Sequence, residues 1–206
     1  MLIYNNLVMK KFRLIVFSLF LGAFLTACAF GVRDDGNDNI TINRDGTLIY
    51  RIRESFSESY YNAEELKNMI ISEAAAYNSQ NVSGAVLANK IEVLNGKTDI
   101  ELKFATVEDY SRFDDILMFC GTIEDAIARG ESLAVILNDV NDKNLSISEK
   151  DIQGMTSEKI LITDFGETIY LPAKAYYISD NAILSEDMKT VHLDPAAGGT
   201  MYIIYK

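Results

Sequence analysis

Residue types on which many enzymes and metal sites depend are scarce in this chain. Its 206 residues include one histidine, two cysteines, two prolines and no tryptophan. A single histidine excludes a metal site built from several histidines, and it leaves His192 as the one candidate base for a nucleophilic triad. His192 alternates with Val191 and Leu193, a pattern typical of a half-exposed strand residue. The sequence therefore offers little equipment for metal or nucleophilic chemistry.

The N-terminal segment has the three-part layout of a secretory signal. Residues 10–13 (KKFR) are mostly basic, and residues 14–25 form an apolar run broken only by one serine and one glycine. Small residues then precede Cys28, as they do before a signal cleavage site. The chain is therefore expected to be exported.

The four residues Leu25-Thr26-Ala27-Cys28 resemble the lipobox of bacterial lipoproteins, and they directly follow an apolar run of the right length. In that family a diacylglyceryl group joins the cysteine sulfur, and cleavage leaves this cysteine as the first mature residue. The resemblance implies that residues 1–27 are a lipoprotein signal peptide and that Cys28 is lipidated. It also implies that the mature chain is anchored in the cell membrane by this lipid, on the extracytoplasmic side.

A membrane-spanning helix is the alternative interpretation of the same run. Nineteen uncharged residues lie between Arg13 and Arg33, which is enough to cross a hydrocarbon core of ~30 Å. A retained helix would keep the basic residues inside, so both interpretations place the rest of the chain outside the cytoplasm. The Leu-Thr-Ala-Cys ending favours the lipoprotein. The start codon stays open between Met1 and Met9, because residues 9–12 (MKKF) form a normal signal opening.

Basic residues are too few to balance the acidic ones. The chain has 19 Lys and Arg against 30 Asp and Glu, for a formal net charge of −11. Residues 1–27 contain three of the basic and none of the acidic residues, so the mature chain has 16 against 30, or −14. This balance argues against nucleic acid as a partner and against electrostatic docking on anionic head groups. It suits a soluble surface or a cationic partner.

The second cysteine has no partner within the chain if Cys28 carries a lipid. Cys120 lies in "LMFCGT" between a helical pattern and a glycine, where a small buried hydrophobic residue is the ordinary interpretation. A reactive thiol would need a base or a cationic setting, and none lies nearby in the sequence.

Residues 28–39 are expected to form a lipidated tether, and residues 40–206 a single extracytoplasmic domain. Asp, Asn and Gly dominate residues 29–39, which repeat with neither a helix nor a strand period. Eleven flexible residues span about 18–20 Å on average. The tether would therefore hold the domain close to the bilayer.

The domain begins with a predicted hairpin and a predicted helix. Apolar residues alternate on both sides of Asp45-Gly46, which predicts a hairpin over residues 40–52. Residues 62–78 then carry apolar residues at helical spacing. Asn62 is the expected N-cap, and Glu65 has the position of a capping-box acid.

A second hairpin is predicted over residues 89–104. Asn95-Gly96 suits a type I′ turn between its strands. This register places Ile91 opposite Ile100 on one face and Lys90 opposite Glu101 on the other.

Two short helices are expected to share one start signal. Thr106 and Thr122 each offer a hydroxyl N-cap followed by first-turn carboxylates, with Gly121 between the helices and Gly130 as a C-terminal stop. The later residues predict a small helix and short strands. The helix is residues 148–155, and the strands are residues 133–137, 159–163, 168–172, 174–179 and 201–206. The fold class is therefore α+β, with a mostly antiparallel sheet, one longer helix and several short ones.

Three segments invite a chemical interpretation that their residues do not support. Asp139–Asp151 begins like a calcium loop, but Lys143 and Lys150 occupy ligand positions and would repel Ca²⁺. Residues 164–166 (DFG) lack the other kinase segments. Residues 194–200 (DPAAGGT) lack the lysine and following helix of a phosphate loop. Polar loops and turns are expected at all three, so no metal or cofactor is predicted.

Two further features leave alternatives open. Acidic pairs such as Asp114-Asp115 could serve a glycosidase, although 30 acids produce neighbouring pairs by chance. The eleven tyrosines, with doublets at Tyr60-Tyr61 and Tyr176-Tyr177, could form an aromatic binding face. Strand propensity explains the tyrosines equally well.

A broader resemblance rests on residues 109–130 (DYSRFDDILMFCGTIEDAIARG) and 159–184 (KILITDFGETIYLPAKAYYISDNAIL). These segments resemble small uncharacterised lipoproteins of Gram-positive, clostridial-type bacteria. The similarity spans most of the mature chain as a pattern of aromatics and glycines. It implies the lipid anchor and a Gram-positive membrane, and it assigns no catalytic residues.

Two functions follow as hypotheses. In the first, the chain is a non-catalytic binding or structural module of the cell envelope, monomeric, with an unidentified envelope partner. In the second, it is an extracytoplasmic hydrolase that acts on glycan or peptide through carboxylates. The first is favoured, because no pair of acids has a local setting that would separate their pKa values.

Overall fold

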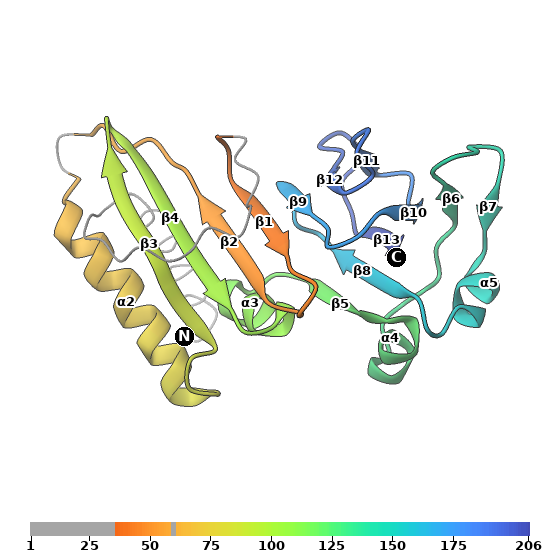
Figure 1. Ribbon diagram of the computed structural model, residues 1–206, viewed down its shortest axis with the longest axis horizontal. Helices are drawn as coiled ribbons and strands as arrows, with labels where there is room; N and C mark the ends of the chain where they lie inside the picture. The colour runs from red at the N-terminus through yellow and green to blue at the C-terminus, as the bar shows by residue number, and fades with distance from the viewer. Residues whose placement is uncertain (1–35, 59–60) are drawn as a thin grey trace, which may run out of the picture. The chain divides into compact units, whose positions relative to one another are not determined.

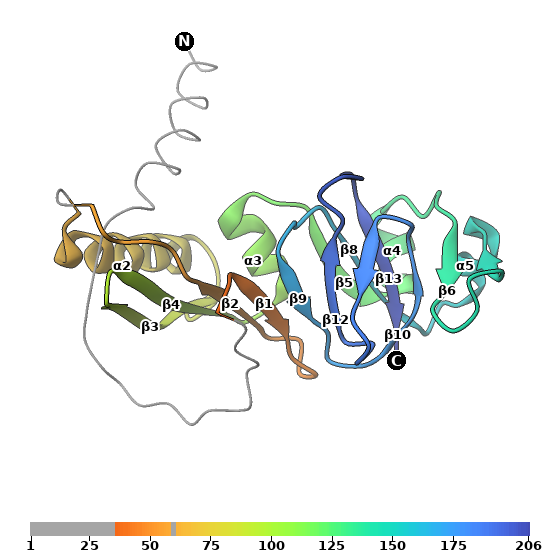
Figure 2. The same ribbon diagram turned by 90° about the horizontal axis from the view of Figure 1, so that it is seen from above.

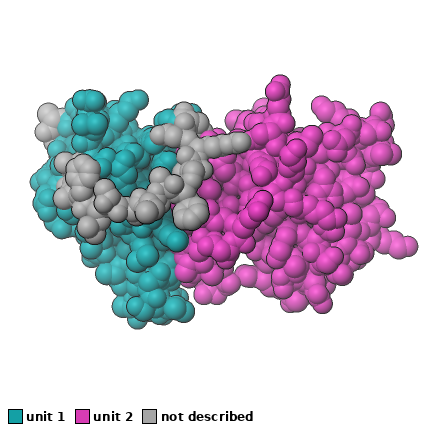
Figure 3. All heavy atoms as spheres, viewed as in Figure 1, with its two compact units in different colours: residues 1–38, 50–103 teal, residues 39–49, 104–206 magenta. Residues whose placement is uncertain are grey.

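The computed structural model describes residues 36–58 and 61–206. The expected signal peptide, Cys28 and most of the tether lie outside these residues. The described chain forms two compact units, coloured separately in Figure 3. Of the described residues, unit 1 contains 36–38, 50–58 and 61–103, and unit 2 contains 39–49 and 104–206. The predicted α+β class is confirmed, since antiparallel pairs dominate the strands and one helix is clearly longer than the others.

Unit 1 is a three-stranded sheet with one long helix. The strands lie in the order β2 (Leu48–Ile52), β4 (Lys97–Phe104) and β3 (Val86–Leu94), and β2 begins in unit 2. Helix α2 (Ala63–Gln80) runs beside β3 (Figure 1). The unit 1 core combines one face of α2 with one face of the sheet. Its buried residues include Leu66, Ile70 and Ala74 from the helix and Ile91, Ile100 and Leu102 from the strands.

Helix α2 begins where the sequence predicts. The Asn62 side chain accepts a hydrogen bond from the Glu64 backbone N–H at 3.0 Å, which satisfies one of the free donors of the first turn. At the other end, the Asn78 amide accepts from Val86 N–H at 2.9 Å and donates to Val86 C=O at 2.8 Å. This two-bond contact ties the last turn of the helix to the start of β3.

The turn between β3 and β4 has the predicted type I′ geometry. Asn95 and Gly96 both have positive φ, 52° and 73°, as that turn requires. The predicted register places Lys90 opposite Glu101, but the Lys90 ammonium group pairs with a diagonal acid of the same face. Lys90 Nζ lies 2.6 Å from Asp99 Oδ2 instead.

The alternation of side chains changes along β3. Val86 and Ile91 are both buried although they are five residues apart, and strict alternation would place them on opposite faces. Asn89 and Lys90 are neighbours, yet both reach carboxylates of β4. We infer a β-bulge near Asn89, which adds one residue to β3 and shifts its side chains.

Unit 2 contains a six-stranded sheet and a smaller set of strands. The sheet has the order β5, β8, β13, β10, β6, β7, and all of its pairs are antiparallel. These strands are β5 (Met118–Thr122), β8 (Lys159–Thr163), β13 (Met201–Tyr205), β10 (Ala175–Ile178), β6 (Leu137–Asp139) and β7 (Ser146–Ile147). The smaller set, in the order β11, β12, β9, β1, is β11 (Ala182–Leu184), β12 (Thr190–Leu193), β9 (Thr168–Tyr170) and β1 (Asn39–Ile42), with β1 parallel to β9.

The turn that follows β1 is closed as the Asp45-Gly46 signal predicts. Asn43 N–H donates to Thr47 C=O at 2.8 Å, and Gly46 N–H donates to Asn43 C=O at 3.1 Å. Gly46 has φ 85°, a value that favours glycine.

Three short helices belong to unit 2, and each begins at a hydroxyl residue followed by an aspartate three residues later. They are α3 (Val107–Asp114), α4 (Ile123–Arg129) and α5 (Glu149–Gly154), with N-caps Thr106, Thr122 and Ser148. Helix α4 ends at Gly130, whose φ is 76°. The predicted caps and the predicted stop are therefore confirmed.

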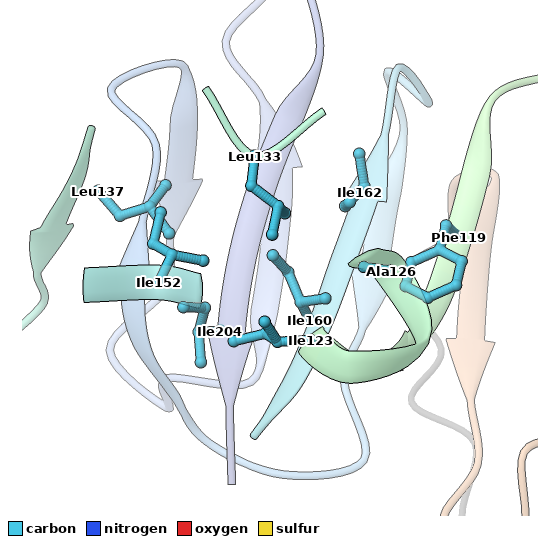
Figure 4. Packing of buried hydrophobic residues seen from close by; sticks show 9 residues of the cluster. All are labelled: Phe119, Ile123, Ala126, Leu133, Leu137, Ile152, Ile160, Ile162 and Ile204. Carbon is cyan, nitrogen blue, oxygen red and sulfur yellow. The ribbon is translucent and has the colours of Figure 1, made fainter. Parts of the chain in front are cut away.

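The core of unit 2 lies on both faces of its central strands. Ile160, Ile162 and Ile204 pack against α4 and α5 in a buried cluster (Figure 4). Leu161 and Ile203 point to the opposite face and are also fully buried. The turned view in Figure 2 shows the strands of unit 2 that carry these residues.

Two sequence predictions in unit 2 need correction. A strand, β5, lies between α3 and α4, where only Gly121 was expected to separate the helices. Of the predicted strand 133–137, only Leu137 is in a strand, as the first residue of β6. β5 pairs with the distant strand β8, and β6 lies between the distant strand β10 and the nearby strand β7. No local pattern identifies the long-range pairs.

Candidate functional site

A hollow in the described chain lies beside strand β5. It is an open depression with a volume of ≈ 310 Å³. We call this hollow the β5 depression. It is lined by Phe119, Cys120, Gly121, Asp125, Ala128 and Arg129. Three consecutive strand residues line it together with residues of α4, so positions that face opposite sides of the sheet both reach it. The depression therefore lies along the edge of this strand.

Local structure positions the two elements that form it. Thr122 ends β5 and is also the N-cap of α4. Its hydroxyl accepts from Asp125 N–H at 3.0 Å, and the Asp125 carboxylate accepts from Thr122 N–H at 2.9 Å. This capping box ties the first turn of the helix to the end of the strand. The hydrogen bonds from Thr122 also hold the Asp125 pKa below its ordinary value.

One wall of the β5 depression is an aromatic ring with an arginine over it. The Arg129 guanidinium carbon lies 5.3 Å from the centroid of the Phe119 ring, a cation–π geometry. Arg129 also reaches Glu108 at 3.2 Å and Glu131 at 3.9 Å. Two acidic partners therefore compensate the positive charge of this side chain.

Cys120 lies in the β5 depression but is not set up as a nucleophile. Its Sγ is 2.9 Å from the hydroxyl oxygen of Tyr205. Burial raises the Cys120 pKa above its ordinary value, so the thiol stays protonated at neutral pH. Burial, followed by the contact with Cys120, likewise raises the Tyr205 pKa. The pair is a neutral contact across the sheet.

A second polar cluster covers one face of the unit 1 sheet. We call it the charged face, and it consists of Arg51, Arg53, Asn89, Lys90, Glu92, Asp99 and Glu101. Its central carboxylate, Asp99, accepts from Lys90 Nζ at 2.6 Å and lies 3.4 Å from Arg53 Nε. Arg51 and Asn89 bond to Glu101. Positive and negative side chains are equal in number here, so the cluster neutralises itself.

The charged face favours the ionised forms of Asp99 and Lys90. Burial acts to raise the Asp99 pKa, but hydrogen bonds and charge from Lys90 and Arg53 outweigh it and the net shift is downward. Burial acts to lower the Lys90 pKa, and its bonds to Asp99 and Glu92 outweigh this and raise it. A carboxyl group with a lowered pKa cannot serve as a general acid at neutral pH.

The structure separates the other residues that the sequence singled out. His192 lies on β12 opposite Ile183 of β11, in the smaller strand set of unit 2. Asp114 accepts from the Tyr110 hydroxyl at 3.2 Å, and Asp115 is the left-handed C-cap of α3 with φ 55°. This acidic pair thus ends a helix.

The three segments expected to be loops and turns have structural roles. Asp139 of the calcium-like loop accepts from the backbone N–H of Asn141 at 2.8 Å, and Asp164 of the DFG tripeptide accepts from Leu117 N–H at 3.2 Å. Asn181 donates to the carbonyls of Gly198 and Thr200 and so fixes the loop between β12 and β13. Among residues 36–58 and 61–206, no group of three or more His, Cys, Asp and Glu side chains could hold a metal ion.

The tyrosines in the described chain are buried or half-buried, so they form no open aromatic face. A bulge in β10 between Ala175 and Tyr177 lets the neighbours Tyr176 and Tyr177 pack on the same core, with ring centroids 5.2 Å apart. The Tyr176 hydroxyl donates to Glu158 at 2.7 Å, and Lys206 lies 2.8 Å from the same carboxyl group. The Glu158 pKa is lowered by these two contacts.

Sequence reasoning identified Thr122 and Asp125 as a cap but missed the β5 depression. Phe119, Ala128 and Arg129 carried no signal, because the hollow depends on β5 being an edge strand. The Phe-x-Gly spacing of Phe119 and Gly121 is the one local feature that could have indicated it.

Comparison with known proteins identifies no relative: the chain matches no protein-family model, no curated protein and no solved structure. Within the described residues, no helix combines the length and the apolar character needed to cross a membrane.

Proposed function

We propose that this chain is a lipid-anchored, non-catalytic binding or structural module of the bacterial cell envelope. The lipid on Cys28 attaches it to the cell membrane, and the folded chain from Asn39 onward faces the extracytoplasmic side. The observation that carries the proposal is the sequence Leu25-Thr26-Ala27-Cys28 directly after a basic region and an apolar run. The chain works as a monomer with an envelope partner, and its acidic balance suits a cationic partner over nucleic acid.

The charge states in the folded chain favour binding over catalysis. A general acid needs a carboxyl pKa raised towards neutrality. In the described chain, the pKa values of Asp99, Asp125, Asp151 and Glu158 are clearly lowered. Their hydrogen-bond donors explain these shifts, so the acids stabilise helix starts and sheet faces. No specific observation favours the hydrolase alternative.

Mass spectrometry of membrane-extracted protein tests the anchor. We expect an N-terminal diacylglyceryl-Cys28 on a chain that lacks residues 1–27. The variant Cys28→Ala should release the folded chain or leave an unprocessed precursor. An uncleaved membrane form, the same in wild type and variant, would overturn the lipoprotein proposal and support a spanning helix.

A second experiment separates binding from catalysis. The purified lipoprotein is used for capture from the native envelope and, in parallel, for a screen of glycan and peptide hydrolysis. We expect a captured partner without turnover. Measurable turnover without any partner would overturn the non-catalytic proposal.

A further inference from the structure

The edge of β5 exposes backbone groups in the β5 depression. β5 is the first strand of the six-stranded sheet, and among the described strands it pairs only with β8. Ile123 N–H donates to Glu158 C=O, and Asp164 N–H donates to Leu117 C=O. In an antiparallel pair, every second residue directs its backbone N–H and C=O groups to the partner strand. These two bonds therefore show which residues of β5 face β8.

The backbone groups of Cys120 point away from β8. Phe119 and Gly121 direct their backbone groups to β8, so the N–H and C=O of Cys120 point away from the sheet. Within the described part of the chain no strand lies on that side, and neither group has a hydrogen-bond partner. Thr122 N–H also points outward, but the Asp125 carboxylate satisfies it. Cys120 therefore presents one free donor and one free acceptor, spaced as an extended strand needs them.

The surroundings of Cys120 suit a peptide side chain. The depression gives a side chain of the added strand a place against the Phe119 ring and Ala128. Two charged side chains line the β5 depression. Arg129 is already paired with two acids, whereas Asp125 makes no ion pair among residues 36–58 and 61–206. The charge of Lys159 also acts on Asp125. Arg129 and Lys159 therefore stand against Asp125, Glu108 and Glu131 at this edge, and the net charge of these five side chains is negative.

We propose that the β5 edge binds an extended peptide segment by strand addition, with Cys120 N–H and C=O pairing to its backbone and a basic side chain beside Asp125. This inference deepens the proposed binding function by naming its site and partner class. Main-chain bonds supply the affinity in this mode, and the flanking side chains select the sequence. The thiol of Cys120 takes no part.

The test uses the full lipoprotein in detergent micelles and a labelled probe, acetyl-Thr-Val-Lys-Val-Thr-amide. Fluorescence anisotropy measures binding. We expect saturable binding, weaker binding when glutamate replaces the lysine of the probe, and none when the probe is fully N-methylated. Equal binding of the N-methylated probe would overturn strand addition, because that probe cannot donate backbone hydrogen bonds.

Two variants on exposed positions of α4 locate the site. Ala128→Trp fills the depression and should abolish binding. Ile127→Trp is the matched control, since Ile127 is 45% exposed and does not line the depression, and it should bind as wild type does. Equal effects of the two variants would overturn the assignment to this edge.

Amide hydrogen exchange at Cys120 gives an independent readout. In the free protein, Cys120 N–H should exchange faster than those of Phe119 and Gly121, which face β8. Probe at ten times its dissociation constant should slow Cys120 exchange about elevenfold. Unchanged exchange would overturn this inference. A lipidated Cys28 with a captured envelope partner would then leave the proposed function standing.

Discussion

Gly121 leaves room for the ring of Phe119. A Cβ atom built on Gly121 would lie 2.7 Å from Phe119 Cζ and 3.4 Å from Asp125 Cβ. The first distance is shorter than any normal carbon contact, so a side chain at this position must displace the ring. Phe119 is only 5% exposed and belongs to the cluster under α4, which leaves the ring little space to move.

The variant Gly121→Val should therefore destabilise the folded chain by about 1–3 kcal/mol, the usual cost of overpacking. Urea unfolding measures it. Gly154→Ala is the control, because nothing lies within 4 Å of a Cβ at this helical position and alanine favours the helix. A Gly121→Val chain as stable as wild type would show that Phe119 can reorient freely.

Acid should weaken the start of helix α4. The Thr122 hydroxyl and backbone N–H hold the Asp125 pKa below its ordinary value of 3.8. A carboxyl group whose pKa is lower in the folded than in the unfolded chain stabilises the fold. This stabilisation is complete above the pKa of the unfolded chain and is lost as the pH falls through the pKa of the folded chain. The melting temperature of the wild type should therefore decrease at pH values below about 4. The melting temperature of the Asp125→Asn variant should decrease less over the same pH range. Parallel curves for both proteins would contradict this role.

The core of unit 1 should not tolerate a charge at Ile100. This residue is 1% exposed, and an aspartate there would be buried without a partner. Ile100→Asp should unfold much of the population, whereas Ile100→Val should cost about 0.5–1.5 kcal/mol. Circular dichroism and urea unfolding compare them. Leu94→Ala, at a position 71% exposed, is the control and should have little effect. A folded Ile100→Asp chain would contradict the assigned core.

Short sequence patterns correctly predicted the turns and helix ends that depend on a few adjacent residues. The Asn95-Gly96 turn, the Thr122 cap and the Gly130 stop each depend on the conformation or hydrogen bonds of a few adjacent residues, and the structure confirms all three. Likewise, Ile91 and Ile100 are both buried as their alternation predicts.

Long-range pairing caused the failures. Val86 and Ile91 of β3 are both buried although they are five residues apart, and the sequence gives no sign of this change of alternation. β5 exists because it pairs with β8, whose residues lie about forty positions later, as in the pair Cys120 and Leu161. The candidate site could not be predicted for the same reason, since an edge is defined by the order of all strands in the sheet.

Removal of metal ions should leave stability unchanged. The aspartates of the calcium-like loop accept hydrogen bonds from the loop backbone, as Asp139 does from Asn141 and Asp142 does from Asn144, and these bonds hold the loop without an ion. Thermal melts with and without EDTA should therefore coincide. A large downward shift with EDTA would contradict this and would restore the calcium interpretation of residues 139–151.

The thiol of Cys120 should react slowly in the folded chain. Burial raises its pKa, which lowers the fraction of the reactive thiolate, and its Sγ contacts the Tyr205 hydroxyl at 2.9 Å. Alkylation by iodoacetamide at neutral pH, followed at Cys120 by peptide mapping, should be several-fold slower in native protein than in urea. The unfolded chain is the internal control, because it has the same thiol in water. Equal or faster reaction in the native state would mean that the fold activates this cysteine. Nucleophilic catalysis would then have to be reconsidered, since an activated thiolate in the β5 depression would meet the first requirement of a cysteine hydrolase.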